Sequence, residues 1–137
     1  MVRQEVITKR LQKLDEYLGI LRKLKRYPYD EFIADPEHYG SVERFLQLAL
    51  ETIADIGNHI ISDLELGIVN WHRDIPAILR EKGHITPQME EKWIRMIGFR
   101  NILVHDYLDI DRQAVYDVLQ NNLNDFEEIK KSFAKFL

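Results

Sequence analysis

The chain contains no cysteine among its 137 residues. It therefore has no disulfide, no thiolate metal ligand and no cysteine nucleophile. Long apolar runs are also missing, because none approaches the roughly 20 residues that cross a bilayer. The first residues, MVRQEVITKRLQKLDEY, are too charged for a signal peptide, so we expect a cytoplasmic protein.

An excess of positive charge is absent as well, since the formal net charge is −4. Broad nucleic-acid binders use a cationic field over much of their surface, so any nucleic acid would meet only a local patch here. The sequence shows no alternating strand pattern, no internal repeat and no low-complexity linker. Its 45% hydrophobic and 31% charged residues indicate a soluble globular protein. We expect one domain over residues 1–137.

Apolar residues recur every three or four positions almost throughout, which is the spacing of amphipathic helices. The expected buried stripe of the first long helix, which ends before Pro28, is Ile7, Leu11, Leu14, Leu18 and Leu21. The second long helix is expected to end near Gly67, and its buried stripe is Val42, Leu46, Ala49, Ile53, Ile56, Ile60 and Leu64. The expected buried stripe of the last long helix is Val115, Leu119, Phe126, Ile129 and Phe133.

Start and stop signals divide the chain between these stripes. Asp35-Pro36 and Thr86-Pro87 combine a capping side chain with proline at the first helical position, and Asp111 can cap the last helix. The segment 69–83 is expected to be a connector with one short helix that closes at Gly83. Residues 30–35 can add a short turn. The sequence thus predicts an all-α, up-and-down four-helix bundle with an additional short helix.

The stretch GFRNILVHDYLDID, residues 98–111, carries polar side chains at the end of the third long helix. At about 100° per residue, its expected core stripe is Trp93, Ile97, Val104 and Leu108. Arg100 falls at the edge of that stripe, Asn101 lies one turn before His105, and Tyr107 shares the side of Arg100. Periodicity alone leaves two interpretations open: boundary side chains that complete the packing, or a functional site.

The residues from Arg100 to Tyr107 form an R-x4-H-x-Y motif that resembles the signature of HepT-type toxins of the HEPN superfamily (higher eukaryotes and prokaryotes nucleotide-binding). The segment VERFLQLALETIADIGNHII resembles the second helix of that family. The order of the expected helices fits the family over most of the chain. The resemblance therefore supports an all-helical HEPN bundle.

What the resemblance implies is a metal-independent endoribonuclease that acts as a homodimer and needs no cofactor. His105 would be the acid/base, because an imidazole titrates near neutral pH. Arg100 would hold the scissile phosphate through its planar donors. Asn101 would orient the imidazole or contact phosphate. Two copies would bring two histidines and two arginines to one cleft.

Tyr107 has a different implied role, since the family pairs the toxin with an MNT-type nucleotidyltransferase antitoxin. That enzyme transfers AMP from ATP to the motif tyrosine, and Tyr107 matches its position. A charged nucleotide beside Arg100 and His105 would block RNA. The alternative is a non-catalytic HEPN subunit that presents substrate to a nucleotidyltransferase, which would not need Arg100 and His105 together.

Asp55, His59 and Asp63 stand four residues apart on the second long helix and so form a stripe. Three interpretations remain open: a metal site, a contribution to the RNA cleft, or a solvated charge stripe. The first of these would make the protein a metalloenzyme whose activity is lost on chelation. His72 is expected to be a loop residue without a partner.

Overall fold

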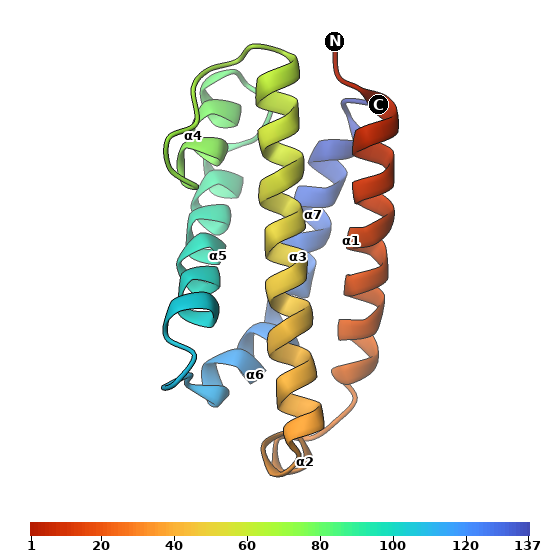
Figure 1. Cartoon of the computed structure of the whole chain (residues 1–137), viewed down its shortest axis with the longest axis vertical. Coiled ribbons are helices and arrows are strands. Elements are labelled where there is room, and N and C mark those ends of the chain that lie inside the picture. Colours follow the sequence, from red (N-terminus) through yellow and green to blue (C-terminus); the bar gives the residue numbers. More distant parts are fainter.

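The computed structural model describes residues 1–137 and consists of seven helices without a strand (Figure 1). They are α1 (Gln4–Leu24), α2 (Tyr29–Ala34), α3 (Pro36–Asp63), α4 (Asp74–Glu81), α5 (Pro87–His105), α6 (Arg112–Asn121) and α7 (Leu123–Ala134). The long helix α3 packs against α1, α5 and α7. The all-α, up-and-down bundle expected from the sequence is confirmed. None of the helices combines the length and apolar character that crossing a membrane requires.

The stripes predicted for the first, second and last long helices form the core. Their side chains are buried, apart from Leu11 and Leu64, which are half-buried against the core. No polar or charged side chain is fully buried. Each buried Leu, Ile or Phe favours folding by roughly 1.5–3 kcal/mol, so the core rests on apolar contacts between helices.

The predicted helix starts are confirmed by their capping contacts. The Asp35 carboxylate accepts a hydrogen bond from the backbone N–H of Glu37 at 2.9 Å. The Thr86 hydroxyl accepts from the N–H of Met89 at 3.1 Å. Asp111 accepts from two backbone N–H groups at the start of α6. Each cap satisfies N–H groups that the first helical turn leaves free, and its loss typically costs ~1 kcal/mol.

The predicted end of the second long helix is wrong by about one turn. α3 ends at Asp63 rather than near Gly67. Glu65 adopts a left-handed φ of 53°, and the N–H of Leu66 donates to the carbonyl oxygen of Ile61 at 3.0 Å. This is a Schellman-type ending built on a glutamate in place of the usual glycine. The short helix does close at Gly83, whose φ is 78°.

The last long helix is in fact two helices, α6 and α7, separated at Asn122. Asparagine is a poor helix former, and Asn122 adopts φ −116° and ψ 3°. Its side-chain amide donates to the Asp125 carboxylate at 3.1 Å, within the first turn of α7. The break lets α6 pack against α2 and α3 while α7 packs against α1, α3 and α5 (Figure 1).

Candidate active site

The face that α5 turns to the core differs from the predicted one. The buried side chains of α5 are those of Trp93, Met96 and Leu103. Of the predicted stripe only Trp93 is buried; Ile97 and Val104 are half-buried, and Leu108 is 84% exposed beyond the end of the helix. The helix is therefore rotated about its axis relative to the prediction, and Arg100 lies within its packed face rather than at the edge.

Arg100 is held by an ion pair with Glu51 of α3. Its Nε and Nη2 atoms lie 2.8 and 2.7 Å from Oε1 of Glu51, and its side chain is only 19% exposed. Nη1 donates to Oδ1 of Asn101 at 3.3 Å. The carboxylate thus occupies one edge of the guanidinium, and the edge formed by Nη1 and Nη2 keeps donors for an anion.

Arg100, Asn101 and His105 line one open surface depression of about 560 Å³, here called the Arg100 hollow. Its other lining residues are Trp71, His72, Arg73 and Ile97. No carboxylate belongs to this lining, although the chain as a whole is acidic. The imidazole of His105 is exposed and makes no hydrogen bond within the chain. The structure therefore brings together the three motif residues that the sequence singled out on the helix.

Tyr107 does not lie on the helix, contrary to the prediction. α5 ends at His105, and the N–H of Asp109 donates to the carbonyl oxygen of Asp106 at 3.0 Å, which closes a turn. Tyr107 is 67% exposed on this turn. It lines a second depression of about 600 Å³, the Tyr107 hollow, whose wall also includes His105. His105 is thus the motif residue that borders both hollows.

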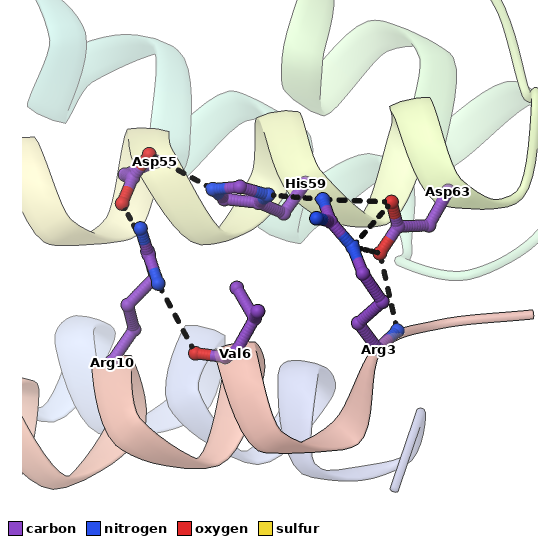
Figure 2. Close-up of polar contacts among 6 residues, drawn as sticks. All are labelled: Arg3, Val6, Arg10, Asp55, His59 and Asp63. Atoms are coloured by element: carbon purple, nitrogen blue, oxygen red, sulfur yellow. Dashed lines mark hydrogen bonds and ion pairs between the residues drawn. The ribbon is translucent and has the colours of Figure 1, made fainter.

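The stripe of Asp55, His59 and Asp63 faces α1 (Figure 2). Arg10 donates to Asp55, while Arg3 donates to Asp63 and contacts Nδ1 of His59 at 3.1 Å. The hydrogen bonds from Arg3 hold the pKa of the Asp63 carboxyl below its usual value.

All three side chains of the stripe contact Arg3 or Arg10, and none of them lines the Arg100 hollow. The stripe is an ion-paired seam between two helices.

Sequence reasoning missed four residues around the Arg100 hollow: Glu51, Trp71, His72 and Arg73. Glu51 stands four residues before Asp55, so it continues the stripe already noticed. Trp71 is a large aromatic residue in a polar loop, which is a signal in its own right. His72 lies in a loop, as expected, and it also lines the wall of the same hollow as Arg100.

Comparison with known proteins identifies the family of the chain. The model of the family described as "Ribonuclease HepT-like" matches residues 7–133. The mRNA nuclease HepT of Shewanella oneidensis is 39% identical over 98 residues, which cover 72% of this chain and 74% of that protein. The tRNA nuclease HepT of Aphanizomenon flos-aquae is 32% identical over 111 residues, 81% and 76% of the two chains.

Solved structures show the same fold. The tri-AMPylated HEPN toxin of Shewanella oneidensis, in complex with an MNT antitoxin, superposes with a TM-score of 0.87 and 28% identity. The match covers 95% of this chain and 97% of the toxin. The family model alone spans nearly the whole bundle, including α3, α5 and the turn that carries Tyr107. The chain belongs to the ribonuclease HepT-like family.

Proposed function

We propose that the chain is a metal-independent endoribonuclease and the toxin of a toxin–antitoxin pair. The observation that carries this proposal is that Arg100, Asn101 and His105 line one hollow free of carboxylates. A phosphodiester is an anion, and such a lining attracts it where the rest of an acidic surface would repel it. The two HepT nucleases of the family support the same reaction class.

The reaction that fits these groups uses the 2′-OH of the RNA. His105 removes the proton from this hydroxyl, and the oxygen attacks the adjacent phosphorus atom. The bond from phosphorus to O5′ breaks, which leaves a 2′,3′-cyclic phosphate and a 5′-hydroxyl. Arg100 presents its Nη1 and Nη2 donors to the phosphorane, whose negative charge grows in the transition state. A second imidazole protonates the leaving O5′.

A second copy of the chain would supply that imidazole. Apolar side chains are exposed around the end of α5, where Ile102 is 42% exposed and Leu108 is 84% exposed. A homodimer that covers this surface around a two-fold axis would place two copies of His105 and Arg100 at one cleft. Gly98 lies on the same helix, and a Cβ there would meet no atom of its own chain, so nothing in the fold itself requires glycine.

Control of the activity is proposed to act through Tyr107. The related toxin from Shewanella oneidensis is AMPylated in its complex with an MNT antitoxin. The Tyr107 hydroxyl makes no hydrogen bond within this chain and lies on an exposed turn, so a partner nucleotidyltransferase could reach it. AMP attached there would bring an anion next to His105 and compete with the RNA phosphate.

Cleavage of RNA by the purified chain in excess chelator tests the proposal. We expect a 2′,3′-cyclic phosphate product or its hydrolysed form, and His105→Ala and Arg100→Ala should each lower the rate by ~10²–10⁴ or more. Lys13→Ala is the control, because Lys13 is exposed on α1 and lines neither hollow. Cleavage that survives His105→Ala would contradict the mechanism. Folded protein without cleavage would favour a non-catalytic subunit of a nucleotidyltransferase.

A further inference from the structure

The loop between α3 and α4 forms one wall of the Arg100 hollow. Trp71, His72 and Arg73 stand there opposite the residues of α5. The Trp71 side chain is 72% exposed, so it adds almost nothing to the core. Leaving a large aromatic side chain in water forfeits the free energy that its burial would give, and such residues commonly mark a binding surface.

The loop presents Trp71 on a fixed backbone. Oδ2 of Asp74 accepts hydrogen bonds from the N–H groups of Asn70 at 3.0 Å and Trp71 at 2.9 Å. The N–H of Asp74 in turn donates to the carbonyl oxygen of Trp71 at 2.9 Å. Because Asp74 begins α4, these bonds tie the loop to a helix that packs on α3 and α5.

The chemistry of this wall matches a nucleotide. The guanidinium of Arg73 makes no ion pair or hydrogen bond within the chain, whereas that of Arg100 is paired with Glu51. An exposed indole offers a flat face on which any base can stack, and a free guanidinium offers donors to a phosphate. A protein partner would need no such cationic surroundings, so charge favours RNA as the occupant.

We propose that Trp71 and Arg73 form a nucleotide subsite of the Arg100 hollow. Trp71 stacks on a base of the RNA next to the scissile phosphate, and Arg73 binds a neighbouring phosphate, with His72 in the wall between them. This inference rests on the proposed function, since it places the RNA at Arg100 and His105. It also explains how an acidic protein binds RNA without a global cationic field.

The intrinsic fluorescence of the protein gives a direct test. The chain has two tryptophans, and Trp93 is buried, so quenching by a stacked base reports on Trp71. A 2′-O-methylated oligoribonucleotide of about 12 nucleotides serves as the probe, because it lacks the attacking hydroxyl and stays intact. We expect quenching on binding, and about a 10-fold weaker Kd for Trp71→Ala, read by anisotropy of a labelled probe.

Matched variants separate stacking from other effects. Trp71→Phe should restore most of the affinity, and Arg73→Ala should weaken binding and flatten its salt dependence. Ile68→Ala is the control, because Ile68 is 80% exposed on the same loop and lines none of the hollows described here. With cleavable RNA, Trp71→Ala should raise KM and leave kcat nearly unchanged.

Three outcomes would overturn the subsite. They are unquenched Trp71 fluorescence, an unchanged Kd for Trp71→Ala, and a Trp71→Ala protein that loses its self-association in sedimentation, which would make Trp71 an interface residue. The proposed function can fail separately. Quenching and tight binding by a chain that cleaves no RNA would retain the subsite and refute the nuclease. RNA cleavage that Trp71→Ala leaves unchanged would refute the subsite and retain the nuclease.

Discussion

Arg100 and Glu51 are 49 residues apart in the chain and lie 2.7 Å apart across the contact between α5 and α3. Nε and Nη2 of the guanidinium both contact Oε1 of Glu51, while Nη1 donates to Asn101. An arginine side chain has four rotatable bonds, so an anchor on one edge fixes where its other edge points. Glu51 therefore acts as a positioning residue for Arg100.

The first prediction follows from this pairing. Glu51→Ala should lower kcat/KM for RNA cleavage by about 10- to 100-fold, because a freed guanidinium no longer holds the phosphate in place. Glu51→Gln keeps an acceptor oxygen and should retain most of the activity. Glu91→Ala is the control, since Glu91 pairs with Arg95 on the outer face of α5. A faster Glu51→Ala enzyme would show instead that the carboxylate competes with the phosphate.

The second prediction concerns the shared cleft. Wild-type chains mixed with His105→Ala chains at constant total concentration should lose activity as the square of the wild-type fraction. At equal amounts about one quarter of the wild-type rate should remain, because only dimers with two intact histidines are competent. Independent sites would leave about half. Mixing with Lys13→Ala chains should cause no loss, because Lys13 is exposed on α1. An active monomer in sedimentation would refute the shared site.

The third prediction concerns Tyr107. Incubation with the cognate nucleotidyltransferase, ATP and magnesium should add AMP to Tyr107 and reduce cleavage without unfolding the protein. Tyr107→Phe removes the nucleophilic hydroxyl and should stay folded, cleave RNA and resist the partner. Intact mass and peptide mapping locate the modification. Label on another residue, or a Tyr107→Phe chain that is still silenced by modification, would show that the tyrosine is wrongly assigned.

The fourth prediction concerns Glu43 of α3. Oε2 of its carboxylate lies 3.9 Å from Nε of Arg112, and neither of these two atoms makes a hydrogen bond. Burial raises the pKa of the Glu43 carboxyl above its ordinary value of 4.5, and the charge of Arg112 offsets only part of this rise. The folded state therefore keeps the proton at a pH where the unfolded chain has lost it.

The sign of the pH effect follows from that difference. The contribution of Glu43 to stability is fully present below pH 4.5 and is lost as the pH rises through the higher folded pKa. The free energy of unfolding of the wild type in urea, relative to that of Glu43→Gln, should therefore fall as the pH rises from 4.5 through the folded pKa of Glu43. Glu81→Gln is the control, because Glu81 is exposed. A difference that grows with pH would contradict the assignment.

The helix starts could be predicted because their causes are local. Asp35, Thr86 and Asp111 cap N–H groups two or three residues away, so the signal and its effect lie together in the sequence. The ending at Glu65 was not predictable in this way. Glutamate has no preference for a left-handed backbone conformation. The conformation of Glu65 is stabilised by the hydrogen bond from the N–H of Leu66 to the carbonyl oxygen of Ile61.

The orientation of α5 could not be read from its own residues. Trp93 belongs to two possible stripes, and the helix carries apolar side chains on both: Ile97, Val104 and Leu108 on one, and Met96 and Leu103 on the other. Contacts with α3, α4 and α7 select the second. The same long-range packing brings Glu51 and Trp71 to Arg100, which is why the motif was visible in the sequence and its surroundings were not.

The position of His105 on the rim of both hollows carries a further consequence for timing. Because His105 borders both hollows, AMP attached to Tyr107 and RNA bound at Arg100 would compete for adjoining space, so bound RNA would obstruct access to Tyr107. A toxin molecule already loaded with RNA would be shielded from its antitoxin. Inhibition by AMPylation would then depend on whether RNA or the antitoxin binds first. Newly made chains without RNA would be inhibited more easily than chains that already hold RNA.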